Sequence, residues 1–313
     1  MPPTTPHAAH GIETVRTVAE LRRVLAGARG RGASVGLVPT MGALHEGHLS
    51  LIRRAREQCG VVVVSLFVNP TQFDERADLD LYPRRESEDR HLAARAGADI
   101  LFAPAPEEVY PGGFATTVEV RGLTERLEGE ARGSEHFRGV TTVVTKLLCM
   151  AAPDVAYFGQ KDAQQVLVIR RLVADLNLPV RIEALPTVRE PDGLALSSRN
   201  ARLTTEERRR ALALPAALAA ARAQVAAGAR SGAAVASAAE ASIRAGGLEP
   251  EYVAVLDPDT LEPLEAVDGE ALLAAAVRVG EVRLIDNIAL GGPAPAPPGS
   301  QRRRGEAVST CSA

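Results

Sequence analysis

Apolar and polar positions follow two alternating patterns over the first 185 residues of the chain. Continuous apolar runs, typical of strands buried on both faces, cover residues 34–39, 61–68, 98–103, 154–158 and 180–185. Apolar residues recur with helical spacing over residues 18–28, 46–60, 86–96, 140–150 and 162–175. Thr17 and Glu20 have the spacing of a capping box before the first helix. This alternation predicts an α/β fold with a Rossmann-like, doubly wound parallel sheet.

The pattern changes after a turn sequence at residues 190–193. Thr204 and Glu207 have the spacing of a capping box, which predicts a helix that continues to about residue 227. A second helix is expected at residues 233–245. Short extended runs follow at residues 252–256, 272–279 and 282–290. Together they predict a smaller α+β domain after the parallel-sheet domain.

The chain therefore divides into three predicted segments. Residues 1–189 form the parallel-sheet domain, and residues 190–290 form the smaller C-terminal domain. Residues 291–313 are rich in proline and carry the arginine run 302–304, a composition that predicts disorder. Such sheets bind ligands beyond the carboxyl ends of their strands. The site is therefore expected in the loops that follow Val38, Val68, Phe158 and Leu185, which lie near the ends of four predicted strands.

Composition and charge argue against several classes of protein. The 36 Lys and Arg residues and 39 Asp and Glu residues give a formal charge of −3, whereas nucleic-acid-binding domains are strongly basic. An Ala-rich stretch at residues 212–228 is interrupted by Pro215 and Arg222, so no transmembrane helix is expected. The N-terminus lacks the apolar core of a signal peptide, and three widely spaced cysteines predict no disulfide framework. We expect a cytoplasmic protein without nucleic-acid or membrane partners.

Lysine is rare in this chain. Lys146 and Lys161 are the only lysines among the 36 basic residues. A genome biased toward arginine codons accounts for the general excess of arginine. A lysine that remains against this bias is expected where a compact, strongly hydrated point charge is needed.

Residues 41–48, Met-Gly-Ala-Leu-His-Glu-Gly-His, connect a predicted strand to a predicted helix. His45 and His48 are three residues apart, so they lie on one face of the first helical turn. The free N–H groups and the positive dipole end of a helix start favour an anion there. Gly42 and Gly47 allow close approach of the backbone. Two imidazoles over such a terminus form a cradle for a reacting phosphate.

Two other interpretations of the histidine pair stay open on the sequence alone. The pair could occupy the helix start without a chemical role. It could also chelate zinc, since histidines at i and i+3 can share a metal ion, with His91 or His136 as a third ligand. No HExxH spacing accompanies the pair, and nucleotide phosphate binding is the favoured interpretation.

A second group of candidate residues follows the predicted strand that ends at Phe158. The sequence Gly159-Gln-Lys-Asp162 places Lys161 toward the same crevice as the histidines. The alternative is a surface lysine at a helix start. Asp162 is expected either to cap the next helix or to bind a ribose hydroxyl, and its spacing favours neither.

Two further patterns are weaker on their own. The sequence Ser197-Ser-Arg-Asn200 offers two hydroxyls and a guanidinium suited to terminal phosphates, although it also forms ordinary turns. Gln72 and Gln165 are uncharged amides that suit the hydroxyl and carboxylate groups of a small polar ligand. Taken singly, either glutamine would be assigned a structural role.

These motifs, in this order and spacing, resemble the pantothenate synthetase (pantoate–β-alanine ligase) family of the nucleotidyltransferase superfamily. The resemblance runs from about Thr14 to Leu290 and rests on PTMGALHEGHLSLI, FVNPTQF, YPR, HFRGV, the GxKDxQQ stretch and LSSRN. It implies a two-step reaction that depends on ATP and Mg²⁺. Pantoate and ATP give pantoyl adenylate and pyrophosphate, and β-alanine then converts the adenylate to pantothenate and AMP. The resemblance also implies a homodimer.

The resemblance implies roles for individual residues. His48 matches a proton donor, His45 its partner on the phosphates, and Lys161 completes the implied catalytic set. The implied ATP-binding residues are Met41, Gly42, Ala43, Leu44, His45, Glu46, Gly47, His48, Gly159, Gln160, Lys161, Asp162, Val188, Leu196, Ser197, Ser198 and Arg199. Gln72 and Gln165 match the pantoate-binding amides, and Gln72 also lies near β-alanine.

Other matches are looser. Asp89, in the acidic pair Glu88-Asp89, falls where family members place a magnesium-associated carboxylate. Glu128 and residues 136–139 fall on the active-site lid and dimer region of the family, and the resemblance leaves their roles open.

The chain departs from the usual family pattern at three positions. Gln160 replaces a usual Glu, Ala163 a usual aromatic residue and Thr71 a frequent Met. None is an implied side-chain donor, so we expect activity with a looser pocket. An adenylyltransferase that passes AMP to a phosphorylated acceptor would need more basic residues near the acceptor. A non-catalytic, RNA-associated relative would need a basic stripe with interleaved aromatic residues, which make up 3% of this chain.

Overall fold

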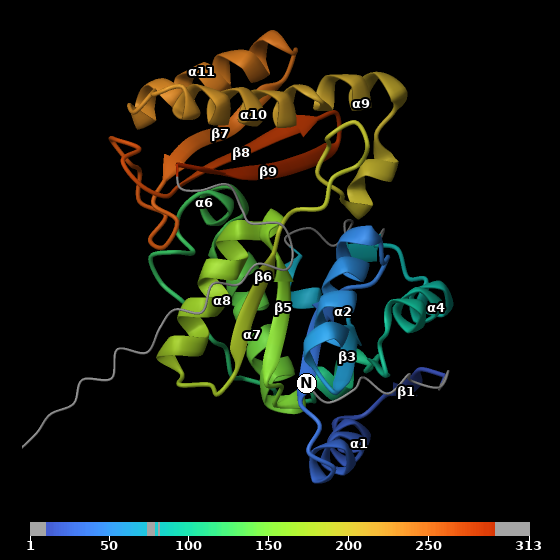
Figure 1. The fold of residues 1–313 in the computed structure, drawn as a ribbon. Coiled ribbons are helices and arrows are strands. Elements are labelled where there is room, and N and C mark those ends of the chain that lie inside the picture. Colours follow the sequence, from blue (N-terminus) through green and yellow to red (C-terminus); the bar gives the residue numbers. More distant parts are fainter. Residues whose placement is uncertain (1–10, 74–78, 81, 292–313) are drawn as a thin grey trace, which may run out of the picture.

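The computed structural model describes residues 11–73, 79–80 and 82–291. Within these residues a six-stranded parallel sheet and a three-stranded antiparallel sheet form two units (Figure 1). This arrangement confirms the predicted fold class. Apart from Gly291, the predicted tail lies outside the described residues.

The strand order of the parallel sheet reverses beside β2, near the centre of the sheet. Its strands are β1 (Glu13–Val15), β2 (Val35–Thr40), β3 (Val61–Leu66), β4 (Ile100–Phe102), β5 (Val155–Gly159) and β6 (Arg181–Leu185). The strand order is β1-β4-β3-β2-β5-β6. From β2 the chain continues to β3 and β4 on one side, and it then returns to form β5 and β6 on the other side of β2. The crevice beyond the carboxyl ends of β2 and β5 is therefore the expected ligand position in this sheet.

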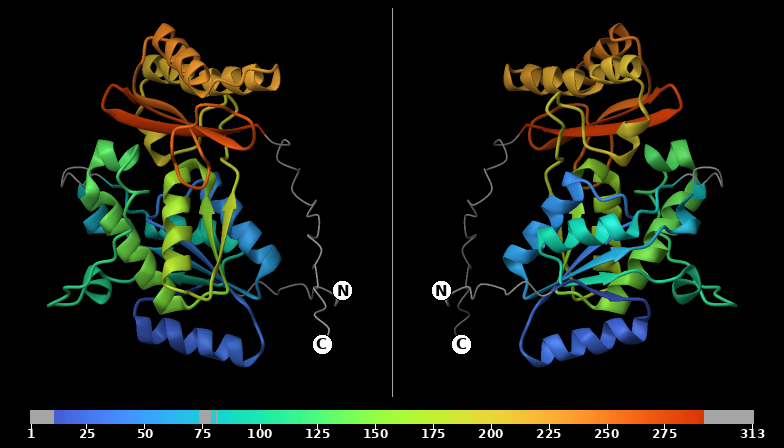
Figure 2. Two further views of the ribbon diagram at one scale, coloured as in Figure 1. Left: turned by 90° about the vertical axis from the view of Figure 1, so that its left-hand side faces the viewer. Right: turned by 90° about the vertical axis from the view of Figure 1, so that its right-hand side faces the viewer.

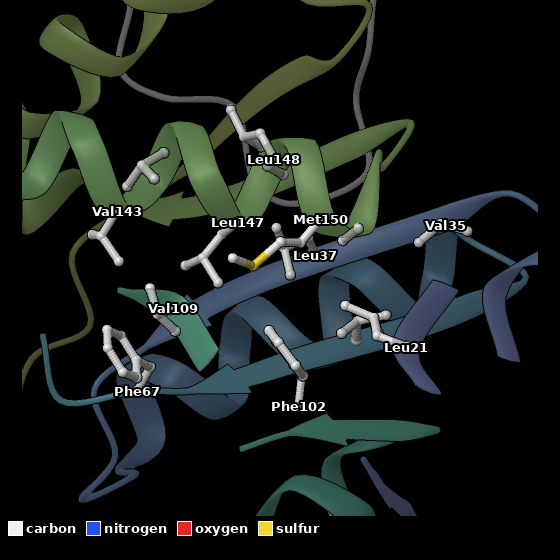
Figure 3. Packing of buried hydrophobic residues seen from close by; sticks show 14 of the residues in the cluster. Leu21, Val35, Leu37, Phe67, Phe102, Val109, Val143, Leu147, Leu148 and Met150 are labelled. Atoms are coloured by element: carbon white, nitrogen blue, oxygen red, sulfur yellow. The ribbon is translucent and has the colours of Figure 1, made fainter. Parts of the chain in front are cut away.

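Helices cover both faces of the parallel sheet. One face carries α1 (Val18–Gly30), α7 (Ser134–Ala151) and α8 (Ala163–Asp175), and the other carries α2 (Glu46–Gln58) and α4 (Glu86–Ala96). Under α7, Leu147 packs in the same buried cluster as Leu37 of β2 and Phe102 of β4 (Figure 3). The Thr17–Glu20 capping box at the start of α1 is confirmed.

The antiparallel sheet lies between its own helices and the parallel-sheet unit (Figure 2). It consists of β7 (Glu249–Leu256), β8 (Ala271–Val279) and β9 (Val282–Leu290), and its helices are α9 (Thr205–Ala211), α10 (Ala213–Ala226) and α11 (Gly232–Ala245). On the face toward the parallel-sheet unit, Leu272 and Ala274 of β8 pack against Ala163 and Leu167 of α8. The smaller unit thus covers the carboxyl end of β5.

Short elements connect these parts. They are α5 (Pro106–Val109), α6 (Glu128–Arg132) and the 3₁₀ turns η1 (Pro70–Gln72), η2 (Gln160–Asp162) and η3 (Ser198–Arg202). No helix in the described part of the chain is both long enough and apolar enough to cross a membrane.

The structure differs from the predicted elements in three places. The single helix expected before residue 227 is divided at Leu212, because Pro215 is tolerated only in the first turn of a new helix. α7 begins at Ser134, earlier than expected. The sequence did not predict β1, α5 or α6, since elements of three to five residues show no clear hydrophobic period.

Candidate active site

The histidine pair occupies the first turn of α2, directly after β2. His45 is the N-cap residue, and its Nδ1 accepts a hydrogen bond from the backbone N–H of Gly47 at 3.2 Å. The backbone N–H of His45 donates to Nδ1 of His48 at 3.3 Å. The two imidazoles thus form a capping box in place of the usual Ser or Thr and Glu, and their ring centroids are 4.2 Å apart.

These backbone bonds select the tautomer of each ring. A nitrogen that accepts a hydrogen bond carries no proton, so a neutral His45 or His48 must carry its proton on Nε2. Burial, and after it the charges of His45 and Lys161, lowers the pKa of His48 to about 3. Burial and Lys161 also lower the pKa of His45. At neutral pH both rings are therefore neutral Nε2–H donors.

The loop between β2 and α2 is held by a buried carboxylate. Asp89 of α4 accepts hydrogen bonds from the backbone N–H groups of Ala43 at 3.0 Å and Leu44 at 2.7 Å, and burial raises its pKa. Gly42 has a φ of +96°, and a Cβ at this position would lie 2.7 Å from Leu66 Cδ1. Asp89 therefore positions the loop by binding the backbone N–H groups of Ala43 and Leu44, two residues that the resemblance assigns to ATP binding.

Lys161 approaches the histidines from the carboxyl end of β5. It lies in η2, and its charge is close enough to lower the pKa of both imidazoles. Asn287 of β9 donates through Nδ2 to the carbonyls of Gln160 at 2.9 Å and Lys161 at 2.8 Å. The C-terminal unit thus holds the turn that carries the cation.

The Ser-Ser-Arg-Asn segment faces the start of α2 across a cavity of about 380 Å³. Leu44, His45, Ser197 and Ser198 all line this cavity. Ser197 caps η3 by accepting a hydrogen bond from the backbone N–H of Arg199, and the backbone N–H of Leu196 donates to the carbonyl of Val188 at 2.9 Å. Residues of two predicted ATP segments, the loop before α2 and the segment that begins at Leu196, thus line one cavity.

The two predicted substrate amides lie in different surroundings. Gln72 ends η1, and its Nε2 lies 2.9 Å from Sδ of Met41, which links it to the loop before α2. Gln165 lies in the first turn of α8, and its side chain makes no hydrogen bond to the described residues. Its neighbour Gln164 is buried and bonds to the backbone of Leu123, Arg126 and Glu128. Of the neighbours Gln164 and Gln165, only Gln165 is thus left available to a ligand.

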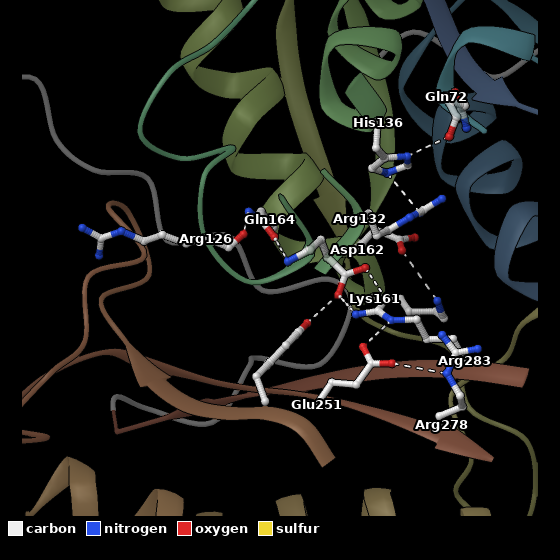
Figure 4. A network of polar contacts seen from close by, with 12 residues as sticks. Gln72, Arg126, Arg132, His136, Lys161, Asp162, Gln164, Glu251, Arg278 and Arg283 are labelled. Carbon is white, nitrogen blue, oxygen red and sulfur yellow. Dashed lines mark hydrogen bonds and ion pairs between the residues drawn. The ribbon is translucent and has the colours of Figure 1, made fainter. Parts of the chain in front are cut away.

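Glu128, whose role the sequence left open, joins the two units of the molecule. Its carboxylate accepts hydrogen bonds from Arg283 of β9 at 2.5 and 2.8 Å and from the Tyr252 hydroxyl at 2.7 Å. Burial alone raises the pKa of Glu128, but the pairing with Arg283 outweighs it and holds the pKa below its ordinary value. Figure 4 shows Arg283 and Glu251 beside the turn of Lys161 and Asp162.

The zinc interpretation of the histidine pair is wrong for the described residues. No group of three or more His, Cys, Asp or Glu side chains among them could hold a metal ion. Of the two histidines considered as a third ligand, His91 is exposed and His136 bonds to the carbonyl of Gln72 at 2.8 Å. Cys59 and Cys149 are free thiols.

Comparison with known proteins connects this geometry to a family. The family model described as pantoate-beta-alanine ligase matches residues 13–289. The chain belongs to the pantoate-beta-alanine ligase family. This finding confirms the resemblance drawn from the motifs. Among curated members, the pantothenate synthetase of Moorella thermoacetica is 57% identical over 283 residues, which cover 89% of this chain and 99% of that protein. The pantothenate synthetase of Cereibacter sphaeroides is 54% identical over 274 residues, with 88% and 98% covered.

Solved structures of pantoate-beta-alanine ligases share the fold. Pantothenate synthetase from Thermus thermophilus has a TM-score of 0.84 and 48% identity, with 88% of this chain and 99% of that chain covered. The ligase from Francisella tularensis, solved in complex with beta-gamma ATP and β-alanine, has a TM-score of 0.74 and 33% identity, with 88% and 97% covered.

Several supporting residues of this ligase were missed at the sequence level. Asn69, Tyr110, Arg283 and Asn287 each contact a predicted site residue or hold its segment. Asn287 is the most visible of them, because it is a polar residue inside the otherwise apolar second half of β9. Tyr110 and Arg283 give no local signal, since the partners shown for them lie 41 and 155 residues away in the sequence.

Proposed function

We propose that this chain condenses pantoate with β-alanine to form pantothenate, with ATP converted to AMP and pyrophosphate through a pantoyl adenylate. Family membership supports the reaction. The observation that carries the proposal is the pair of neutral imidazoles, fixed as Nε2–H donors, beside the ammonium of Lys161 where the sheet order reverses.

In the first step, a carboxylate oxygen of pantoate attacks the α-phosphorus of ATP, and pyrophosphate leaves with the bonding electron pair. The α2 N-terminus and the two Nε2–H groups stabilise the negative charge on the phosphorus oxygens as it increases. Lys161 adds a full positive charge. Ser197, Ser198 and Arg199 would bind the terminal phosphates from the opposite segment.

In the second step, the β-alanine amine attacks the acyl carbon of the adenylate, AMP leaves, and the amine loses a proton. Gln72 and Gln165 hold pantoate for both steps. The chain needs no nucleophile of its own, because AMP is the leaving group and the main task is to position two reactants.

Mg²⁺ fits this site as part of the ATP substrate. Each oxygen of Asp89 accepts one backbone N–H and retains a lone pair. Mg²⁺ is commonly bound by one or two carboxylates together with phosphates and water, so Asp89 would be the protein ligand of a Mg²⁺·ATP complex. The ion would neutralise charge on the phosphates.

The remaining assignments rest on the resemblance. Residues 1–189 would bind nucleotide and pantoate, residues 190–290 would act as a lid domain, and the enzyme would be a cytoplasmic homodimer. Sedimentation of the purified chain tests the dimer.

Product analysis tests the proposed reaction. The purified chain with Mg²⁺ and ATP is expected to release AMP and pyrophosphate steadily, in amounts equal to the pantothenate formed, only when pantoate and β-alanine are both present. Steady AMP release without an amine, or without pantoate, would contradict the ligase. Transfer of AMP to a phosphorylated acceptor would indicate an adenylyltransferase instead.

A further inference from the structure

The turn that carries Gln72 begins with a buried amide of fixed orientation. Asn69 is 1% exposed and caps η1. The backbone N–H of Thr71 donates to Asn69 Oδ1 at 3.4 Å, and Asn69 Nδ2 donates to the carbonyl of Gly139 at 3.1 Å. Because a backbone N–H can only donate and a carbonyl can only accept, these two contacts decide which end of the Asn69 amide is which.

The orientation of Asn69 determines the orientation of Gln72. Asn69 Nδ2 also donates to Gln72 Oε1 at 3.1 Å, so the side-chain carbonyl of Gln72 faces Asn69. Its Nε2 then points toward Sδ of Met41, at 2.9 Å. A thioether is a weak acceptor, so a ligand oxygen can replace it as the partner of these N–H groups.

Two hydroxyls strengthen the orientation of Asn69. Its Oδ1 also accepts from the Tyr110 hydroxyl at 2.8 Å and from Thr71 Oγ1 at 2.9 Å. The Tyr110 ring packs edge-on against Phe114, with ring centroids 5.1 Å apart. Lys146 places its Nζ 4.5 Å from the Phe114 centroid and 5.8 Å from that of Tyr110. The rare lysine that the reaction does not use therefore packs against the aromatic pair that holds the Tyr110 hydroxyl.

Helix α7 fixes the backbone of the same turn. A Cβ at Gly139 would lie 2.2 Å from the Thr71 carbonyl oxygen, so only glycine lets α7 approach this closely. Arg132 can only donate, so its contact with Nε2 of His136 at 3.1 Å leaves the His136 proton on Nδ1. That Nδ1–H donates to the backbone carbonyl of Gln72 at 2.8 Å (Figure 4).

We propose that Tyr110 and Thr71 are positioning residues that act through Asn69 on the Gln72 amide. They make Gln72 offer its N–H groups, rather than its carbonyl, to the acid that the enzyme activates. This inference rests on the proposed function, in which Gln72 binds pantoate. Thr71 stands where the family often has Met, so in this chain a hydroxyl donor replaces an apolar side chain.

Steady-state kinetics of pantoate-dependent ATP–pyrophosphate exchange test the inference. The double variant Tyr110→Phe/Thr71→Val removes both hydroxyls and keeps the side-chain shapes. We expect its KM for pantoate to rise about tenfold, the size of an effect from two neutral hydrogen bonds, with kcat and the KM for ATP within twofold of the unaltered chain. Asn69→Asp cannot donate to Gln72 and should raise the pantoate KM further.

Two variants separate positioning from a general structural effect. Thr71→Ser keeps the hydroxyl, and in the Tyr110→Phe background it should restore most of the pantoate affinity that Thr71→Val loses. Tyr157→Phe removes another buried tyrosine hydroxyl, bonded to Gln58 Oε1 at 2.7 Å, and should leave the pantoate KM unchanged.

The outcomes differ clearly. A pantoate KM within twofold of the unaltered value in the double variant, or equal losses for Thr71→Ser and Thr71→Val, would overturn the inference. Parallel losses in kcat, ATP affinity and melting temperature would overturn it as well, because they indicate a role in folding. Failure of the proposed function would appear differently, as no pantoate-dependent exchange by the unaltered chain.

Discussion

The site has two groups of polar residues. We call His45 and His48 at the start of α2 the phosphate wall, and Asn69 and Gln72 in the η1 turn the acid wall. Different contacts hold the two walls in place. At the start of α2, His45 and His48 bond to backbone N–H groups within three residues of their own positions. At the Gln72 turn, one of the two hydroxyls that orient Asn69 comes from Tyr110, 41 residues away, and the imidazole that bonds to the Gln72 backbone carbonyl comes from 64 residues away. The imidazoles of the phosphate wall are therefore oriented by local contacts, whereas the acid wall also depends on the packing of α5 and α7.

The largest effect is expected in the locally built wall. His48→Ala removes one Nε2–H donor and one side of the capping box, and it should slow single-turnover adenylate formation by about 10²–10³-fold. His91→Ala removes an exposed histidine from α4 and is the matched control, with no expected change. A decrease of less than twofold for His48→Ala would reject its role at the phosphates.

Lys161 tests whether a point charge is needed between the two walls. Lys161→Arg keeps the charge but replaces the ammonium with a planar fork, and we expect the rate to fall by about 10–100-fold, the range for a hydrogen bond to a charged group. Lys146→Arg is the matched control, because arginine also interacts favourably with aromatic rings. Equal rates for Lys161→Arg and the unaltered chain would contradict the explanation from lysine rarity.

Asn287 tests the long-range support of that cation. Asn287→Ala removes both hydrogen bonds to the carbonyls of Gln160 and Lys161, so the η2 turn is held less firmly against β9. We expect kcat/KM for ATP to fall by about 2- to 10-fold. Urea unfolding is measured in parallel. A loss of stability with unchanged kinetics would show that Asn287 supports the fold alone.

The stability of the folded chain is expected to decrease in acid because of His48. The pKa of His48 falls from 6.5 to about 3 on folding, because of burial and then the charges of His45 and Lys161. Between these pH values the unfolded chain binds a proton that the folded chain does not bind. The free energy of unfolding therefore falls as pH decreases through this range, by about 1.4 kcal/mol per pH unit from this group.

The variant His48→Gln has no side chain at this position that binds a proton in this pH range. Urea unfolding at several pH values should show a shallower decrease for this variant between pH 6.5 and 3. Identical slopes for the variant and the unaltered chain would mean that His48 titrates normally in the folded state.

The contrast between the walls explains what could be predicted from sequence. The fold follows from continuous apolar strands and two capping boxes, which are local patterns, and α9 begins at the box formed by Thr204 and Glu207. The segments of His45, Lys161 and Ser197 could be placed together because parallel strands end at one edge of the sheet. Tyr110 and Asn287 could not be found in this way, since hydrogen bonds across 41 and 126 residues leave no spacing to read.

Asp89 shows the same limit. Its sequence position suggested a metal ligand, and the structure adds that its two oxygens also accept hydrogen bonds from the loop before α2. The local pattern identified an acidic residue of interest, but only the tertiary structure shows which backbone donors it contacts.

The central claim is that both imidazoles are neutral and carry their protons on Nε2. Long-range ¹H–¹⁵N NMR of the histidine-labelled chain measures this directly, with the signals of His45 and His48 identified among those of the six histidines by the variants His45→Gln and His48→Gln. At pH 7 we predict the Nε2–H tautomer for both rings, and a His48 signal that does not change between pH 7 and 5. A protonated His48 near pH 6.5, or an Nδ1–H tautomer for either ring, would contradict the account.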